Sequence, residues 1–223
     1  MNLHKPFVYF PNLLTDRQCD DIIKLGTTKL QSATTVDGRD KTNKEKSIAV
    51  SDMTNEEIEK KGLTDKAYMR DSEIAWLSDN WIYNLINPRI QEANKHAGWN
   101  WDYEYIEQIQ FTKYGLNQFY NWHADGNSDH YSVYKNKPNP QMNGKIRKIS
   151  VTINLVDGSE YEGGNLKFDF GPQGGENRFK VINEIRPKGS MVVFPSFFYH
   201  QVTPVTKGTR YSLVMWCCGK PWR

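Results

Sequence analysis

The chain has 223 residues, of which 38% are hydrophobic and 13% aromatic, so it can bury a substantial core and does not have the composition of a disordered protein. Its 29 basic and 26 acidic residues nearly balance, which gives no general reason to expect a nucleic acid or a membrane as a partner. Three cysteines, two of them the neighbours Cys217 and Cys218, do not make a disulfide scaffold. We expect a single domain over residues 1–223.

The first residues, MNLHKPFVYFPNLL, contain no continuous apolar run of signal-peptide length. No stretch of the chain approaches the roughly 20 apolar residues that cross a membrane. We therefore expect a soluble protein in the reducing cytoplasm.

The first half of the chain predicts supporting helices. Thr15 is followed three residues later by Gln18, the spacing of a capping box, and apolar residues then recur at helical spacing up to Gly26. Residues 32–70 are polar and lysine-rich, which predicts a long loop with a short helix around residues 55–61. From residue 72 to residue 97, apolar side chains recur at steps of three and four, which predicts one long helix, or two helices split near Pro88.

Two groups of lysines stand out in the polar stretches. We interpret both groups as parts of solvated loops: Lys41, Lys44 and Lys46, and then Lys135, Lys137, Lys145 and Lys148.

The second half changes to short β-branched and aromatic runs separated by Gly, Pro or Asn, which predicts strands. The runs are YEYIEQIQFTKYG, KISVTINLV, GNLKFDF, GSMVVFP, FYHQVTPV and TRYSLVMWCC. Short strands behind a helical first half predict an α+β fold. Its core would be a double-stranded β-helix (jelly roll) over about residues 101–218, with helical support over about residues 1–100.

The histidines suggest a metal site. In the sequence WHADG, His123 and Asp125 are two residues apart, so their side chains leave the same face of an extended segment. His200 follows the apolar run MVVFPSFFY, where a strand would deliver it to the same cavity. Two histidines and one carboxylate form the facial triad that suits Fe(II) and leaves coordination positions open.

Arg210 strengthens this interpretation, since an HxD pair alone occurs often by chance. It lies ten residues after His200, at the start of the run TRYSLVMW. A turn around residues 204–208 would join the two strands and place a fixed, bidentate cation beside the metal. Such a cation requires an anionic partner there.

Four segments resemble the prolyl 4-hydroxylase-like branch of the Fe(II)- and 2-oxoglutarate-dependent dioxygenases: YGLNQFYNWHAD, YEGGNL, GSMVVFPSFFYH and TPVTKGTRYSLVMW. The resemblance implies Fe(II) on His123, Asp125 and His200, and 2-oxoglutarate on the iron with its distal carboxylate on Arg210. Tyr114 resembles the tyrosine that hydrogen-bonds the same carboxylate. The resemblance also implies dioxygen as a substrate, ascorbate as a reductant and decarboxylation to succinate.

Three more positions match residues that contact the peptide in prolyl hydroxylases: Tyr120, Arg147 and Trp216. The resemblance therefore implies a peptidyl proline in a peptide or protein as the substrate. Each position also has a structural interpretation, since Tyr120 and Trp216 suit a core and Arg147 suits a surface.

The sequence also departs from the family pattern. Many collagen-type members have lysine where Arg210 stands, which argues against a collagen-like substrate. The polar stretch that follows Asp125 contains Asp129 and His130, and we interpret residues 126–146 as a lid or substrate loop.

Several alternatives stay open. The same machinery could hydroxylate another protein side chain or a small molecule. A nucleic-acid demethylase is disfavoured, because that branch has a second arginine soon after the first, and here none follows Arg210 until Arg223. A jelly-roll binding module without catalysis is the non-enzymatic alternative.

Overall fold

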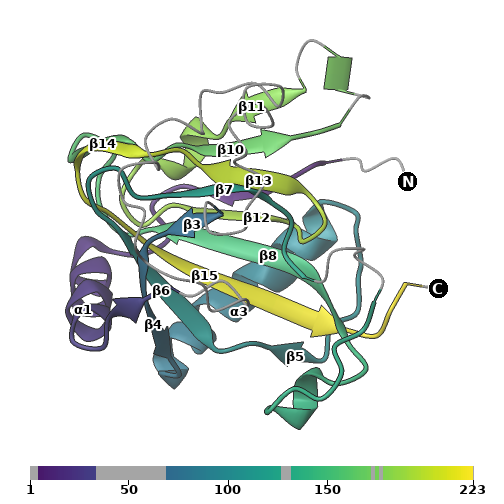
Figure 1. The fold of residues 1–223 in the computed structure, drawn as a ribbon. Helices are drawn as coiled ribbons and strands as arrows, with labels where there is room; N and C mark the ends of the chain where they lie inside the picture. The colour runs from purple at the N-terminus through teal and green to yellow at the C-terminus, as the bar shows by residue number, and fades with distance from the viewer. Residues whose placement is uncertain (1–4, 34–68, 127–131, 172–173, 176–177, 223) are drawn as a thin grey trace.

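The protein is described from a computed structural model, over residues 5–33, 69–126, 132–171, 174–175 and 178–222. Two antiparallel sheets face each other in this part of the chain, with helices outside the larger one (Figure 1). The larger sheet has the strand order β1-β12-β8-β15-β6-β4-β2, with β5 paired to β15, and the smaller sheet has the order β11-β10-β13-β7-β3. The fold is thus mostly β, with the jelly-roll-like core that was expected, and the first 100 residues contribute strands to it as well as helices.

The strands of the larger sheet are β1 (Val8–Phe10), β2 (Gln31–Ser32), β4 (Glu73–Leu77), β5 (Tyr105–Ile106), β6 (Ile109–Tyr114), β8 (Ile146–Asn154), β12 (Met191–Pro195) and β15 (Arg210–Gly219). Those of the smaller sheet are β3 (Arg70–Asp71), β7 (Phe119–His123), β10 (Leu166–Asp169), β11 (Phe179–Val181) and β13 (Tyr199–Val202). A separate pair joins β9 (Tyr161–Gly163) to β14 (Val205–Gly208), and short 3-10 turns are η3 (Pro140–Met142) and η5 (Asn183–Ile185). The strand runs predicted in the second half are therefore confirmed.

Helix α1 (Asp16–Thr27) begins at the predicted capping box. The backbone N–H of Gln18 donates to the Thr15 hydroxyl, and the Gln18 side chain accepts from the Thr15 backbone N–H at 2.9 Å. These bonds satisfy amides that have no partner within the first turn of a helix. Cys19 and Ile22 face inward and are fully buried.

The helix predicted over residues 72–97 is wrong in its first part. Residues 73–77 form strand β4, which pairs with β6 from Glu73↔Lys113 to Leu77↔Ile109. This short apolar run is compatible with both helical and strand periodicity, and it is extended because it pairs with a neighbouring strand. Helix α3 (Asn80–His96) follows and contains Pro88 without splitting there.

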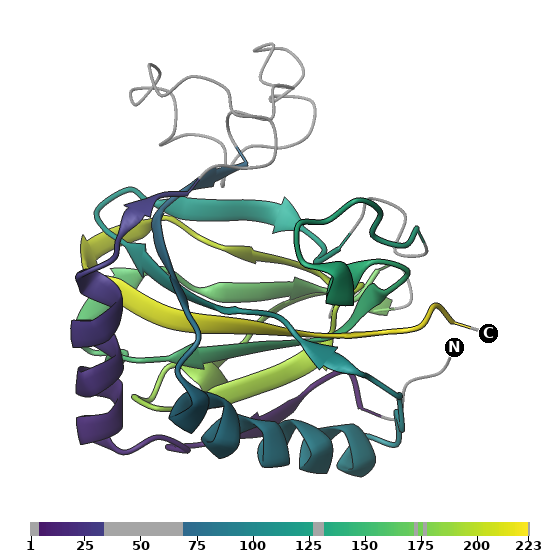
Figure 2. The same cartoon turned by 90° about the horizontal axis from the view of Figure 1, so that it is seen from below.

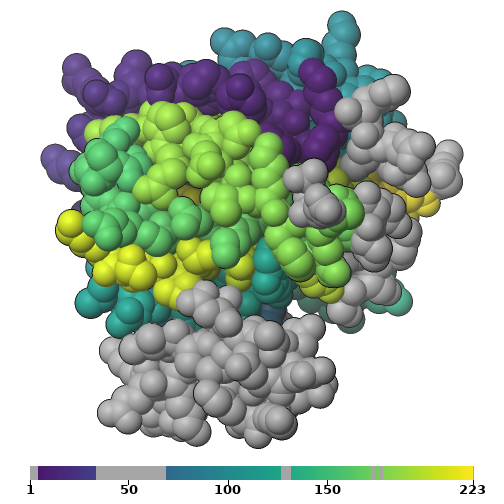
Figure 3. Space-filling model, turned by 90° about the horizontal axis from the view of Figure 1, so that it is seen from above, coloured from purple at the N-terminus to yellow at the C-terminus, as the bar shows by residue number. Residues whose placement is uncertain are grey.

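The larger sheet has two buried faces. On one face, alternate residues of β8 and β15 pack with both helices in a single core, in which Ile153 and Leu213 are fully buried. Figure 2 shows α1 and α3 lying along the outside of the larger sheet. The intervening residues, among them Ser150 and Thr152, point toward the smaller sheet and are also buried. In Figure 3, residues around β10 and β11 of the smaller sheet, in light green, form part of the outer surface of the molecule.

The predicted turn over residues 204–208 is wrong, because residues 205–208 form strand β14, which pairs with β9. This crossover carries the chain from β13 in the smaller sheet to β15 in the larger sheet, so His200 and Arg210 approach one cavity from opposite sheets. The backbone at residue 163 passes so close to residue 204 that only glycine fits there, since a Cβ on Gly163 (φ 69°) would collide with the Pro204 carbonyl.

Lys148 departs from the interpretation of its group as a solvated loop. It lies on β8 and is 6% exposed, and its ammonium sits 4.6 Å from the centre of the Trp222 ring. The first lysine group and the short helix expected around residues 55–61 lie outside the described residues. Within the described ranges, no helix has the length and apolarity needed to cross a membrane.

Candidate metal centre and adjoining pocket

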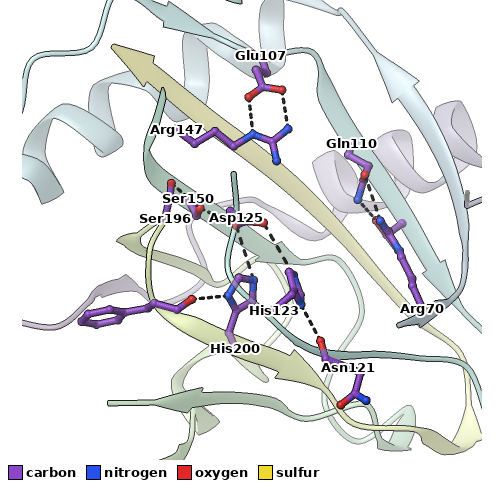
Figure 4. A network of polar contacts seen from close by, with 12 residues as sticks. Arg70, Glu107, Gln110, Asn121, His123, Asp125, Arg147, Ser150, Ser196 and His200 are labelled. Carbon is purple, nitrogen blue, oxygen red and sulfur yellow. Dashed lines mark hydrogen bonds and ion pairs between the residues drawn. The ribbon is translucent and has the colours of Figure 1, made fainter. Parts of the chain in front are cut away.

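The structure brings the three predicted metal ligands together between the two sheets (Figure 4). His123, the last residue of β7, pairs in register with His200 of β13, and their ring centroids are 4.1 Å apart. Asp125 lies just beyond β7, with one carboxylate oxygen 3.8 Å from His123 Nε2 and the other 3.7 Å from His200 Nε2. All three candidate ligand atoms lie within 4.8 Å of one another.

Backbone carbonyls orient both imidazole rings. His123 Nδ1 lies 2.7 Å from the Asn121 carbonyl oxygen, and His200 Nδ1 lies 2.9 Å from that of Phe198. A carbonyl can only accept, so Nδ1 carries the proton in each ring and the lone pair of Nε2 faces the centre. The Tyr120 ring stacks on His123 at 3.5 Å and limits its rotation further.

The electrostatics favour the protonation states that bind a metal. Burial, followed by the neighbouring His200, lowers the pKa of His123 to about 3, so this imidazole is neutral at pH 7. Burial alone would raise the pKa of Asp125, but its charged and hydrogen-bonding neighbours, His200 foremost, together outweigh burial. The pKa therefore lies below its usual value and the carboxylate is ionised. Two imidazole nitrogens and one carboxylate fit Fe(II) and leave positions free for further ligands.

A cavity of about 430 Å³, part of it open to solvent, adjoins this centre. Its floor is the second buried face of the larger sheet, and Leu166, Phe194 and Val202 form an apolar wall. The remaining lining residues are Gln110, Tyr114, Tyr120, Thr152, Arg210, Ser212, Val214 and Trp216, together with the three candidate ligands.

Arg210 is the cation of this cavity. It is 1% exposed, its Nε has no hydrogen-bond partner in the described part of the chain, and its Nη1 donates only a long bond of 3.4 Å to Ser212 Oγ. The guanidinium carbon lies 5.5 Å from the centre of the Tyr114 ring, opposite Arg210 in the β15–β6 pair. Leaving a buried charge unpaired is costly, so this arrangement fits an anionic ligand.

The three predicted substrate contacts differ in their surroundings. Tyr120 and Trp216 line the cavity, and the buried Trp216 Nε1 has no partner among the described residues. Arg147 is not among the lining residues. Its guanidinium donates to both carboxylate oxygens of Glu107, at 2.5 and 2.7 Å, and stacks 3.8 Å above the Trp216 ring.

Several polar residues in and beside the cavity were not predicted from the sequence. Ser150 donates to Asp125 Oδ2 at 2.6 Å and lies 2.8 Å from the Ser196 hydroxyl. Gln110 and Thr152 line the floor. The available signal was the alternation of polar and apolar residues in these strands, which usually indicates one buried and one solvated face.

The predicted lid over residues 126–146 is described only in part. Asp129 and His130 lie outside the described residues. Further along, Tyr134 is 6% exposed, and its backbone exchanges hydrogen bonds with Lys145 and Gly144. The described part of the segment therefore folds back on itself beside β8.

Comparison with known proteins agrees with this geometry. Residues 109–218 match the family model of the 2OG-Fe(II) oxygenase superfamily. The PKHD-type hydroxylase YbiX of Escherichia coli (strain K12 / DH10B) is 36% identical over 107 residues, which are 48% of this chain and 40% of that protein. The counterpart in Shigella boydii serotype 18 is 34% identical over 106 residues, with the same coverage. The matched part thus spans less than half the length of these relatives.

Two solved structures share the fold. The viral collagen prolyl hydroxylase vCPH of Paramecium Bursaria Chlorella virus-1 superposes with a TM-score of 0.58 at 19% identity, covering 96% of this chain and 97% of that one. A Trichoplax adhaerens prolyl hydroxylase in complex with a peptide fragment of hypoxia inducible factor gives 0.59 at 15% identity, covering 95% and 83%. The chain is thus similar to the 2OG-Fe(II) oxygenase superfamily over residues 109–218, and the two solved structures show that the fold is shared.

Proposed function

We infer that the chain is an Fe(II)- and 2-oxoglutarate-dependent oxygenase, and we propose that it hydroxylates a peptidyl proline. The observation that carries the inference is a His–Asp–His cluster sharing one cavity with a buried arginine whose Nε has no partner in the described part of the chain. The two imidazoles and the carboxylate suit the metal, and the arginine suits a dicarboxylate beside it.

Fe(II) would be held by His123 Nε2, His200 Nε2 and the Asp125 carboxylate. When bound, the iron couples decarboxylation of 2-oxoglutarate to succinate with insertion of one oxygen atom of dioxygen into a C–H bond of the substrate. The protein residues bind and orient, since this chemistry requires no general base from the chain.

The cosubstrate would lie along the floor of the cavity. Arg210 offers a planar fork of N–H donors that matches the distal carboxylate of 2-oxoglutarate, and the Tyr114 phenol lies on the neighbouring strand. The apolar wall of Leu166, Phe194 and Val202 keeps water from the reacting atoms.

The substrate would enter past Tyr120 and Trp216, which line the cavity and offer flat aromatic surfaces to a proline ring. Arg147 stacks on the Trp216 ring next to the cavity and would contact the peptide beside Trp216. The two solved prolyl hydroxylases with this fold support a proline-containing peptide as the substrate class. We also propose that ascorbate serves as the reductant.

The first test is anaerobic titration of the purified protein with Fe(II) and then with 2-oxoglutarate, for wild type and His200→Ala. We expect the variant to lose metal binding. His96→Ala is the matched control, because His96 ends helix α3 with its ring nitrogen beside Lys5. Unchanged metal affinity in His200→Ala would remove this residue from the centre.

The second test is aerobic incubation with a panel of proline-rich peptides, with succinate release as the readout, with and without ascorbate. Matched peptides with alanine in place of proline serve as controls. Turnover that no proline peptide stimulates, but that another side chain or a small molecule does, would reassign the substrate and keep the oxygenase.

A further inference from the structure

The candidate metal ligands belong to the smaller sheet and the loop beyond it, but the position of one of them depends on the larger sheet. His123 and His200 are fixed by the ladder of the smaller sheet, where they face each other in register. Asp125 lies beyond the end of β7, outside that ladder. Its backbone N–H instead donates to the carbonyl of Ser196 at 2.9 Å, just after β12 of the larger sheet. A carboxylate on a loop thus depends on the opposite sheet for its position.

Two serine hydroxyls complete this anchor (Figure 4). Ser150 Oγ lies 2.6 Å from Asp125 Oδ2 and 2.8 Å from Ser196 Oγ, and both serines are fully buried. An ionised carboxylate can only accept, so Ser150 donates its one proton to Asp125. The remaining bond must then run from the Ser196 hydroxyl to the Ser150 oxygen. The hydrogen bonds therefore run in one direction, from Ser196 through Ser150 to Asp125.

The backbone holds both serines in place. Ser150 lies in the middle of β8, opposite Phe194 in the β12–β8 pair. The backbone N–H of Ser196 donates to the Lys148 carbonyl at 3.0 Å, which extends that pairing past the end of β12. The rigid larger sheet thereby fixes the direction of both hydroxyls.

We propose that Ser150 and Ser196 are positioning residues for the metal-ligating carboxylate. Ser150 occupies Oδ2 of Asp125 and holds the side chain in one rotamer, so that Oδ1 is presented to the metal as a single ligand atom. Ser196 acts through Ser150 by orienting its hydroxyl. The inference rests on the proposed metal centre, and it assigns a role to two residues that touch neither the metal nor a substrate.

The test uses Co(II), whose visible absorption reports coordination geometry without turnover. The protein is titrated with Co(II) in the presence of a competing chelator, and the affinity and the absorption spectrum are recorded for each variant. We expect Ser150→Ala to weaken Co(II) binding roughly tenfold to a hundredfold, as for other residues that orient a ligand, and to change the spectrum. Ser196→Ala should have a smaller effect in the same direction.

The double variant separates a relay from two independent contacts. If Ser196 acts through Ser150, the double alanine variant binds Co(II) no more weakly than Ser150→Ala alone. Additive losses would overturn the relay. Ser190→Ala is the matched control, because Ser190 is equally buried and accepts one hydrogen bond, from the backbone N–H of Asn12, away from the centre. It should lower the melting temperature without changing affinity or spectrum.

Wild-type affinity and spectrum in Ser150→Ala would overturn the proposal while leaving the metal centre intact. Loss of Co(II) binding in His200→Ala, measured in parallel, keeps the two outcomes apart. If Ser150→Ala does not fold, Ser196→Ala decides the question. An affinity and spectrum like those of Ser190→Ala would then refute the positioning role.

Discussion

Replacing Arg210 with methionine should stabilise the ligand-free protein and abolish cosubstrate binding. The guanidinium is 1% exposed, and its Nε has no partner in the described part of the chain, so the folded state bears an uncompensated desolvation cost. Methionine has a similar length and no charge. We expect the free energy of unfolding to rise by about 1–3 kcal/mol. For a chain of this size, each kcal/mol raises the melting temperature by about 2–4 °C.

The effect on binding has the opposite sign. Hydrogen bonds to charged groups contribute about 1.5–3 kcal/mol each, so losing a bidentate contact should weaken the binding of 2-oxoglutarate by about 3 kcal/mol or more. That loss corresponds to roughly a hundredfold or greater rise in Kd. Arg210→Lys keeps the charge without the fork and should lose about tenfold.

The assay is thermal unfolding of the Co(II)-loaded protein without and with 2-oxoglutarate. Arg186→Met is the matched control, because this arginine donates to the Asn165 side chain and to backbone carbonyls of Gly158 and Tyr161, and its removal should destabilise. The reasoning is refuted if Arg210→Met melts below wild type without ligand, or if 2-oxoglutarate raises its melting temperature as much as that of wild type.

Three further outcomes follow from the fold. Gly189→Ala should cost several kcal/mol in urea unfolding, because φ is 74° and the added Cβ would collide with the Leu14 carbonyl; a wild-type midpoint would contradict the collision. Leu213→Ala, in the fully buried core, should cost about 2–5 kcal/mol in the same assay, and less than 1 kcal/mol would mean that the site collapses around the cavity. Burial raises the pKa of the Cys19 thiol to about 11, so its thiolate fraction at pH 8 is far below that of an exposed cysteine and rises with pH. Labelling of this thiol should therefore be slow in the native protein and complete in urea. Fast labelling of Cys19 in the native protein would contradict its burial.

The sequence was most informative where spacing and chemistry coincide. His123 and Asp125 are neighbours on one short segment, and an extended backbone already points them the same way. His200 follows one apolar run and Arg210 begins another, and both runs predict buried strands. The capping box at Thr15 could also be predicted, because helix capping depends on residues within four positions of each other.

The errors arose where long-range pairing decides the structure. The run from residue 73 to residue 77 fits a helix by its period and becomes a strand because β6 is available to pair with it. Residues 205–208 read as a turn and pair with β9. The role of Ser150 was not predicted, for a related reason. A serine alternating with isoleucine and valine indicates a solvated face, and only the second sheet turns that face into an interior.

The two buried faces of the larger sheet have different functions, since one face forms the folding core and the other lines the cavity. The core shared with the helices contains Ile149, Val151 and Ile153 of β8 and Leu213, Met215 and Cys217 of β15, and the cavity is lined by Thr152 of β8 and by Arg210, Ser212, Val214 and Trp216 of β15. Substituting Thr152 or Val214 should therefore change what binds in the cavity while leaving the core beneath the helices unchanged. The binding surface and the core that supports the helices can thus change separately.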